Sequence, residues 1–244
     1  MTLILETSTA VAHAWWWRTG DGPVAPTDLA LLSEEERERA ARFVHQRSAV
    51  SFVAGRAASR RILSGLLDVA PEEIRLGRRP CPGCGDPLHG PPAVIAPATP
   101  LWISISHTAS CGMLAVARVP VGVDVEAVRD FSVAELASST LTESERHVVL
   151  GTEEGAARTR GFLRCWTRKE AVLKAVGVGI ATDLTTVETR PELSGPAVVA
   201  TGVPGTPSSW VVADLAVPDA WAAALSVPAD AEGSRPEIRL HQHV

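Results

Sequence analysis

The sequence has no run of about 18 or more uncharged apolar residues, and this absence excludes a transmembrane helix. Cationic residues are the minority, with 23 Lys and Arg against 28 Asp and Glu and a formal net charge of −5, which argues against broad binding to a nucleic-acid backbone. Four cysteines are too few for a disulfide scaffold in 244 residues. The N-terminus lacks the basic start of a secretory signal, so we expect a cytoplasmic protein without membrane or nucleic-acid partners.

The apolar content is that of a folded protein, with 45% hydrophobic and 21% charged residues, and the length allows one large domain or two small ones. Capping-box sequences at Ser33–Glu36 and Thr142–Glu145 predict two helix starts. Helical periodicity predicts longer helices over Val50–Leu67 and Ala156–Val176, the second stopped by Gly177.

Strand-like runs precede and follow these helices. They are Leu3–Trp17, Leu101–Ser106, Met113–Arg118, Val121–Glu126, Thr185–Thr189, Ala197–Ala200, Trp210–Leu215 and Trp221–Val227. Val119-Pro120 predicts a hairpin turn between two of them. Because the order of strand, helices and strands occurs twice, we predict an α+β fold of two similar lobes, 1–118 and 119–227, with a flexible tail over 228–244.

The first candidate for chemistry is the segment Gly122–Glu126. On a strand, side chains two positions apart share a face, so the carboxylates of Asp124 and Glu126 would lie side by side. Two adjacent carboxylates repel each other unless a cation lies near them, and an oxygen-preferring divalent ion such as magnesium would serve. The alternative is an exposed acidic edge strand.

The second candidate lies inside the long helix predicted near the middle of the second half. Trp166, Glu170 and Lys174 are spaced four residues apart and share one face, with Lys169 at its edge. Glu170 could add a third carboxylate to a metal, while Lys169 and Lys174 could neutralise phosphate. The alternative is an ordinary helix ion pair between Glu170 and Lys174.

The third candidate is Ser106-His107, at the end of a predicted strand. Both side chains could hydrogen-bond a phosphate, but neighbours on an extended chain point apart and cannot form a nucleophile–base pair. A cluster that only forms a turn is the alternative.

The fourth candidate is the knuckle Cys81-Pro-Gly-Cys84 with His89 nearby. It lies in a connection from Gly77 to Pro92 in which nine of 16 positions are Gly or Pro. A tetrahedral structural zinc site needs four ligands and this loop offers three, which disfavours bound zinc at Cys81 and Cys84.

Taken together in this order, Ser106-His107, Gly122–Glu126 and the block Trp166–Lys174 resemble the signature of Sfp-type 4′-phosphopantetheinyl transferases. The resemblance extends from about Ser33 to Val227. It implies two α+β lobes related by a pseudo-twofold, with the active site in the cleft between them. It also implies transfer of the phosphopantetheine arm of coenzyme A to a serine of an apo acyl- or peptidyl-carrier protein, with magnesium as cofactor, by a monomer.

The resemblance also assigns residue roles. The residues that resemble the magnesium ligands are Asp124, Glu126 and Glu170, and we expect Glu170 to be the general base. Lys169 and Lys174 resemble the diphosphate-binding lysines, and Ser106 and His107 the coenzyme A contacts. Glu145 corresponds to a further acidic site residue.

Three positions depart from the family pattern by lacking a cation, namely Ser51, Pro91 and Val178. Arg47 or Arg56 could replace the first, and Arg78 or Arg79 the second. These losses leave open a first alternative, a non-catalytic paralogue that binds coenzyme A or a partner. A second alternative, which rests on the Cys81–Cys84 knuckle and is poorly supported by the acidic net charge and the incomplete ligand set, is a zinc-knuckle interaction protein. For an acidic carrier protein, the candidate docking residues are Arg56, Arg60 and Arg61.

Overall fold

The computed structural model describes residues 11–87, 89–108, 110–178, 182–229 and 237–243. The first lobe has a four-stranded sheet in the order β10-β1-β5-β4. Its strands are β1 (Val11–Arg18), β4 (Trp102–Thr108), β5 (Cys111–Ala117) and β10 (Glu237–Gln242). The helices are α1 (Pro26–Leu29), α2 (Glu34–Ala41) and α3 (Gln46–Leu67), followed by a 3-10 turn (Pro71–Glu73) and the hairpin β2 (Arg75–Arg78) and β3 (Pro92–Ala96).

The second lobe has a four-stranded antiparallel sheet in the order β6-β9-β8-β7. Its strands are β6 (Gly122–Ala127), β7 (Ala197–Ala200), β8 (Ser209–Asp214) and β9 (Trp221–Pro228). Its helices are α4 (Val133–Thr140), α5 (Glu143–Gly151) and α6 (Ala156–Val176), with a 3-10 turn at Leu184–Thr186. The predicted α+β fold, with each sheet packed by helices, is confirmed.

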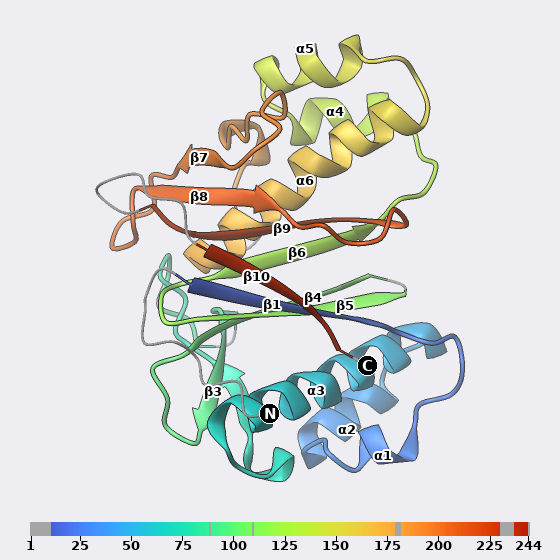
Figure 1. The fold of residues 1–244 in the computed structure, drawn as a ribbon, viewed down its shortest axis with the longest axis vertical. Helices are drawn as coiled ribbons and strands as arrows, with labels where there is room; N and C mark the ends of the chain where they lie inside the picture. Colours follow the sequence, from blue (N-terminus) through green and yellow to red (C-terminus); the bar gives the residue numbers. More distant parts are fainter. Residues whose placement is uncertain (1–10, 88, 109, 179–181, 230–236, 244) are drawn as a thin grey trace.

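The two sheets lie together in the middle of the molecule, with helices on the outside (Figure 1). The alternation of side chains along β1 explains this layering. Trp15 and Trp17 pack with Ile62 and Leu63 of α3. Trp16, on the opposite face, packs in the core that the two sheets share. On the far side of the second sheet, α6 packs its own apolar face on Trp210 and neighbouring side chains.

The capping boxes predicted at Ser33 and Thr142 are present, and α6 begins and ends at the predicted residues. It stops at Gly177 because that residue adopts a left-handed conformation, φ 92°, which glycine tolerates without strain. The part of the first predicted strand that is described is Val11–Arg18; Leu3–Ala10 lies outside the described residues.

Three expectations about elements are wrong. Residues 237–242 of the expected flexible tail form β10, which pairs in parallel with β1 and covers its edge. The segment Thr185–Thr189 is not a strand, because it begins in a 3-10 turn capped by the Asp183 side chain. Val119-Pro120 joins strands of different sheets rather than a hairpin, since β5 pairs with β1 and β4 while β6 pairs with β9.

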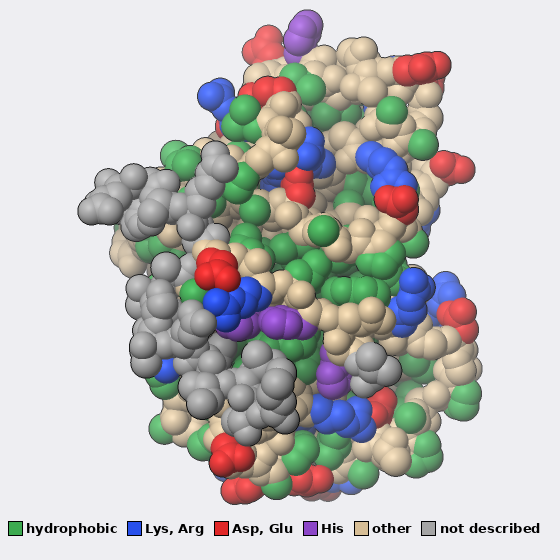
Figure 2. Space-filling view, in the orientation of Figure 1, with side chains coloured by type: hydrophobic (Ala, Val, Ile, Leu, Met, Phe, Trp, Pro, Cys, Tyr) green, Lys and Arg blue, Asp and Glu red, His purple; other side chains and the backbone are tan. Residues whose placement is uncertain are grey.

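No helix in the described ranges is both long and apolar enough to span a bilayer. On the face seen in Figure 2, cationic and anionic side chains are interspersed, without a large field of one sign.

Candidate functional site

The candidate site begins where the edge strands β4 and β6 of the two sheets meet. Two serine side chains of β4 satisfy the outward-facing backbone of β6: the N–H of Val123 donates to Ser104 Oγ at 3.1 Å and that of Val125 to Ser106 Oγ at 3.3 Å. The hydroxyl of Ser106 in turn donates to Oδ1 of Asp124 at 2.8 Å. Ser104 and Ser106, two positions apart on β4, therefore connect the two lobes, and Ser106 also positions the side chain of Asp124 between them.

Lys174 of α6 completes this cluster. Its Nζ lies 2.6 Å from Oδ1 of Asp124 and donates to Ser106 Oγ at 2.9 Å. Asp124 is only 3% exposed, and Oδ2, its other oxygen, has no hydrogen-bond partner among the described residues. Asp124 is thus half satisfied by protein groups, and one buried oxygen remains for another ligand.

Glu170, one turn before Lys174 on α6, is in the same condition. It is 9% exposed, and its Oε1 is buried without a hydrogen-bond partner in the described part of the chain. Burial raises the pKa of the Glu170 carboxyl, the negative charge of Asp124 raises it further, and Lys174 acts in the opposite direction. The charge of Asp124 therefore acts on Glu170, although the two carboxyls come from a strand and a distant helix.

Glu126 belongs to the same acidic group. Burial raises the pKa of its carboxyl and Asp124 adds to the shift, while a hydrogen bond from Trp166 Nε1 at 3.3 Å lowers it. The three carboxyls are more widely spaced than in a closed metal centre, because the one trio of potential ligand atoms within 4.8 Å of one another in the described ranges is elsewhere. Asp124 is the centre of the acidic group.

The close approach of β6 and α6 makes this group possible. A Cβ added at Gly122 would lie 1.9 Å from the carbonyl oxygen of Ala171 and 2.5 Å from the nitrogen of Ala175. The strand that carries Asp124 therefore lies directly on the helix turn that carries Glu170 and Lys174, and only glycine permits that contact.

A cavity of about 390 Å³ opens beside Lys174, at the junction of the lobes. Its wall comes from α2, α3, the β2–β3 connection, β4 and the end of α6. The cationic and imidazole side chains that line it are Arg39, Arg56, Arg78, His89, His107 and Lys174. A concave surface with this lining suits a ligand that carries several negative charges.

Phe52 of α3 organises two of these cations. The guanidinium groups of Arg39 and Arg56 lie 5.1 Å and 5.5 Å from the centre of its ring, a cation–π arrangement. Burial lowers the pKa of Arg56, although Glu36 opposes the shift. Sequence reasoning missed Arg39 because it lies in a helix charged on most faces, where nothing distinguishes one arginine from the rest.

Ser106 and His107 point in different directions, as their adjacency on a strand predicts. Ser106 is buried against Asp124, whereas His107 is exposed and lines the cavity. Although much of its surface is open to the cavity, the surrounding protein partly desolvates the imidazole, and this desolvation, followed by the positive charge of Lys174, lowers the pKa of His107. An anionic ligand in the cavity would act in the opposite direction to these cations and would favour the protonated imidazole.

The structure does not bring Lys169 into the site. Its side chain is fully buried on the other side of α6, where Nζ forms an ion pair with Glu145 at 2.6 Å and donates to the carbonyls of Leu184 and Val187. Glu145 also accepts from the backbone and hydroxyl of Thr189. The predictions that Lys169 binds phosphate and that Glu145 lies in the site are wrong, because one residue along a helix rotates a side chain by about 100°.

Two of the three positions at which this chain lacks the cation of the family pattern lie in the cavity wall. Ser51 and Pro91 both line the cavity, so the wall carries fewer positive charges than the family pattern predicts. Arg78 lines it as well, whereas Arg79 stacks on Trp102 at 4.0 Å, and Arg47 pairs with Asp21 outside it. Of the proposed substitutes, Arg56 and Arg78 are in place.

Among the suggested docking residues, Arg60 is buried and pairs with Glu36 at 2.7 Å, so it cannot contribute to an exposed surface. Arg61 is partly exposed and pairs with Asp28.

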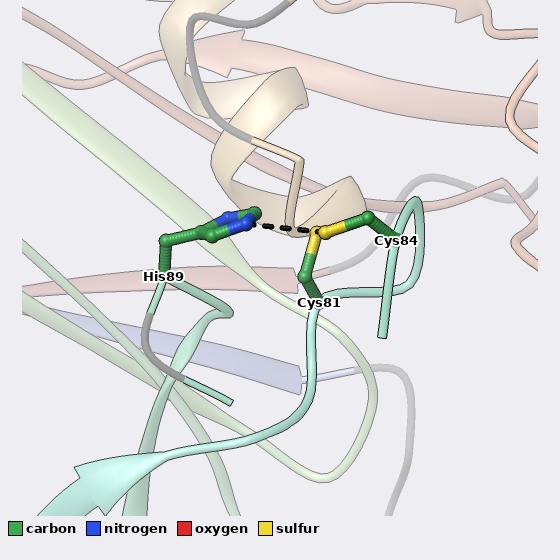
Figure 3. Close-up of side chains that lie close together, drawn as sticks. All are labelled: Cys81, Cys84 and His89. Carbon is green, nitrogen blue, oxygen red and sulfur yellow. Dashed lines mark hydrogen bonds between the residues drawn. The ribbon is translucent and has the colours of Figure 1, made fainter. Parts of the chain in front are cut away.

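The knuckle and His89 form a compact cluster, of which His89 also lines the cavity. Figure 3 shows Cys81, Cys84 and His89 pointing toward one another, and their ligand atoms all lie within 4.8 Å of one another.

Comparison with known proteins agrees with this geometry. Residues 120–226 match the model of the 4′-phosphopantetheinyl transferase superfamily, a segment that contains Asp124, Glu126, Glu170 and Lys174. The chain is 31% identical over 153 residues to the 4′-phosphopantetheinyl transferase HetI of Nostoc sp., an alignment that covers 62% of each protein.

Two further relatives are more distant. The 4′-phosphopantetheinyl transferase Sfp of Bacillus subtilis is 24% identical over 163 residues, 66% of this chain and 67% of the relative. The L-aminoadipate-semialdehyde dehydrogenase-phosphopantetheinyl transferase of Mus musculus is 27% identical over 169 residues, 66% of this chain and 53% of the relative. The alignments thus span between about half and two thirds of these relatives.

Proposed function

Because the chain belongs to the 4′-phosphopantetheinyl transferase superfamily, we propose that it transfers the 4′-phosphopantetheine arm of coenzyme A to a serine of an apo acyl- or peptidyl-carrier protein. The products are the holo carrier protein and adenosine 3′,5′-bisphosphate. One observation carries the proposal. Asp124 and Glu170 each have a buried carboxylate oxygen with no hydrogen-bond partner among the described residues, and Lys174, which pairs with Asp124, lines a cavity with several cations.

The cavity supplies the binding chemistry for coenzyme A. Its nucleotide carries a diphosphate and a 3′-phosphate, and these meet Arg39, Arg56 and Arg78 around the wall, with His107 beside Lys174. Cations in a partly desolvated cavity bind phosphate more strongly than they would in water. Lys174 also neutralises charge on the diphosphate, and Ser106 acts indirectly by holding Asp124 and Lys174 in position.

The residues present fit magnesium. Asp124, Glu126 and Glu170 would hold the ion, because they offer only oxygen ligands and two of these oxygens are buried with no partner in the part of the chain that the structure describes. When bound, magnesium supplies positive charge that offsets the charge of the diphosphate under attack.

Glu170 is the residue that accepts the proton. The carrier serine forms a bond to phosphorus, the phosphorus–oxygen bond to the departing nucleotide breaks, and the serine proton passes to the carboxylate, directly or through a water. The raised pKa of Glu170 brings its affinity for a proton closer to that required near neutral pH.

A second candidate is a paralogue that binds coenzyme A without transferring the arm. The observation that favours it is the cavity wall, where Ser51 and Pro91 occupy positions at which the family pattern has cations. Such a paralogue would bind coenzyme A in the cavity through its arginines but would not transfer the phosphopantetheine arm.

The test is mass spectrometry of several apo carrier proteins incubated with this protein, coenzyme A and magnesium. We expect a mass gain of one phosphopantetheine on the carrier serine. Glu170→Gln should remain folded and bind coenzyme A yet lose most transfer. Coenzyme A binding in calorimetry without any mass gain would favour the paralogue, and turnover like that of the wild type in Glu170→Gln would contradict the role of Glu170 as base.

A further inference from the structure

The β2–β3 connection brings three soft metal ligands together outside the acidic site. Cys84 Sγ and His89 Nε2 lie 3.1 Å apart, and Cys81 Sγ is within 4.8 Å of both. The edges of a tetrahedral zinc site with thiolate and imidazole ligands are about 3.5–3.8 Å long. The three side chains point toward one another (Figure 3), and all three ligand atoms lie within 4.8 Å of one another, so small side-chain movements would bring them to this spacing.

The backbone around Cys81 is folded as a knuckle. The N–H of Gly85 donates to the carbonyl of Cys81 at 2.7 Å, and the N–H of Cys81 donates to the carbonyl of Asp86 at 2.9 Å. Gly85 adopts φ 76°, a conformation that favours glycine. The backbone N–H groups of Cys84 and Gly83 also donate hydrogen bonds to the Cys81 thiol, an arrangement that orients its sulfur toward the other two side chains.

The fourth position of a tetrahedral site would fall to a water molecule or to Asp86 of the same loop. Oδ2 of Asp86 lies 3.6 Å from His89 Nε2, but no oxygen of Asp86 lies within 4.8 Å of all three ligand atoms of the cluster. Asp86 would have to move toward the cysteines to bind the same ion, whereas a water molecule requires no such change.

The knuckle is packed against the end of α6. A Cβ added at Gly83 would lie 3.4 Å from Val178 Cγ1, and one added at Gly177 would lie 3.2 Å from Pro82 and 3.1 Å from Pro91. Figure 3 shows the end of this helix behind the cluster. The loop of the first lobe therefore rests on the helix of the second lobe that carries Glu170 and Lys174.

The end of the loop is also a wall of the cavity. His89, Gly90 and Pro91 line it, and Arg78, another lining residue, donates to the carbonyl of Gly90 at 2.7 Å. The segment that joins the knuckle to β3 thus has the metal-ligand cluster at one end and the cavity at the other.

We propose that Cys81, Cys84 and His89 bind one zinc ion, with Asp86 or a water as fourth ligand, and that the ion holds the loop in the conformation that forms the cavity wall. Binding displaces the protons of both thiols. The second half of the proposal rests on the proposed function, since it takes coenzyme A as the ligand of the cavity; the first half does not.

The metal itself is tested on the full-length chain with any affinity tag removed. We expect about one zinc per wild-type chain by elemental analysis, lost in Cys84→Ser and in His89→Gln. Both side chains are exposed, so these changes leave the core intact, which circular dichroism checks. The matched control is His147→Gln, an exposed histidine on α5 that should retain the zinc.

Cobalt(II) provides an independent readout. Added to zinc-free wild-type protein, it should give the thiolate-to-metal charge-transfer band and the intense visible bands of tetrahedral cobalt, both absent in Cys84→Ser. A wild-type chain that holds no zinc as purified and takes up neither zinc nor cobalt would overturn the proposal.

The effect on the cavity is measured by calorimetric titration of coenzyme A. Cys84 does not line the cavity, yet we expect Cys84→Ser to weaken coenzyme A binding roughly tenfold. The affinity of His147→Gln for coenzyme A should equal that of the wild type. Zinc bound at full stoichiometry, with equal coenzyme A affinity in wild type and Cys84→Ser, would overturn the role in the cavity wall. If coenzyme A binds neither protein while zinc is present, the proposed function fails and the metal site stands.

Discussion

At the scale of single residues, the carboxylates of the acidic group have fewer hydrogen-bond and ion-pair partners than their oxygens can accept. Lys174 and Ser106 contact one oxygen of Asp124. The other oxygen of Asp124 and one oxygen of Glu170 are buried without partners in the described ranges. Lys169 and Lys174 are the chain's two lysines, and only the second reaches this group. Such a set of carboxylates is a cost to the folded protein until a cation binds.

The first prediction concerns Glu170→Gln without magnesium. Because the pKa of Glu170 is raised on folding, the unfolded chain ionises first, and stability falls as pH rises from about 4.5 through the folded pKa. Above that range the folded protein bears the full cost of ionising the buried carboxyl of Glu170. Because Glu170→Gln removes this charge, the variant should melt at a higher temperature than wild type at pH 7.5. Thermal unfolding in chelator measures this difference.

The same experiment repeated with magnesium should reverse the order. The ion binds the folded wild type and raises its melting temperature, with little effect on Glu170→Gln. Glu153→Gln, which removes an exposed carboxylate, is the control and should change neither temperature. If Glu170→Gln were less stable than wild type in chelator, the buried charge of Glu170 would not destabilise the folded protein, contrary to this prediction.

At the scale of elements, the contact between β6 and α6 places the acidic groups of strand and helix together. Gly122→Ala would place a methyl group 1.9 Å from a helix carbonyl, an atom that cannot move aside without moving α6. We expect a loss of about 3 kcal/mol in unfolding free energy from urea denaturation, and weaker magnesium binding.

Gly161→Ala is the matched control on α6. A Cβ there meets nothing closer than 3.8 Å, and alanine favours a helix over glycine, so the variant should gain about 0.5–1 kcal/mol. Equal stabilities for the two alanine variants would show that strand and helix are not in this close contact.

The buried ion pair of Lys169 and Glu145 is a second element-scale feature, since it joins α6 to α5. Lys169→Met leaves the buried carboxyl of Glu145 without its cation, and we expect it to cost about 3–5 kcal/mol of stability in urea denaturation. The control on the same helix is Arg160→Ala, whose partner Asp219 is exposed; it should cost less than about 1 kcal/mol. A folded Lys169→Met with selectively impaired coenzyme A binding would restore Lys169 to the site.

At the scale of the whole molecule, the end of the chain returns from the second lobe to the first. β10 lies beside β1 at the edge of the first sheet (Figure 1), and Ile238 and Leu240 pack against the core between the sheets. The unpaired edge of a strand is a site of aggregation, and β10 covers that of β1.

Truncation after Pro228 should therefore destabilise the chain by about 2–4 kcal/mol, because two apolar side chains lose their burial and β1 loses its ladder. Urea denaturation gives the loss, and size-exclusion chromatography should show association through the freed edge. A truncated chain as stable and as monodisperse as the full-length one would mean that β10 contributes nothing to the fold.

Features that depend on a few neighbouring residues were determined by the sequence alone. The capping boxes at Ser33 and Thr142 and the end of α6 at Gly177 each involve groups within four residues or one backbone conformation, so the local sequence is enough to predict them. The grouping of Asp124 and Glu170 was also predicted, although from a resemblance rather than from local physics.

Contacts between distant segments required the tertiary structure. Lys169 and Lys174 have the same side chain, and their different fates depend on which face of α6 meets Glu145 and which meets Asp124. The partner of β10 lies more than 200 residues away, and the ligand cluster of Cys81, Cys84 and His89 depends on how its loop folds back. The free energy of such contacts comes from packing and charge across the chain, and a pattern of neighbouring residues carries no record of it.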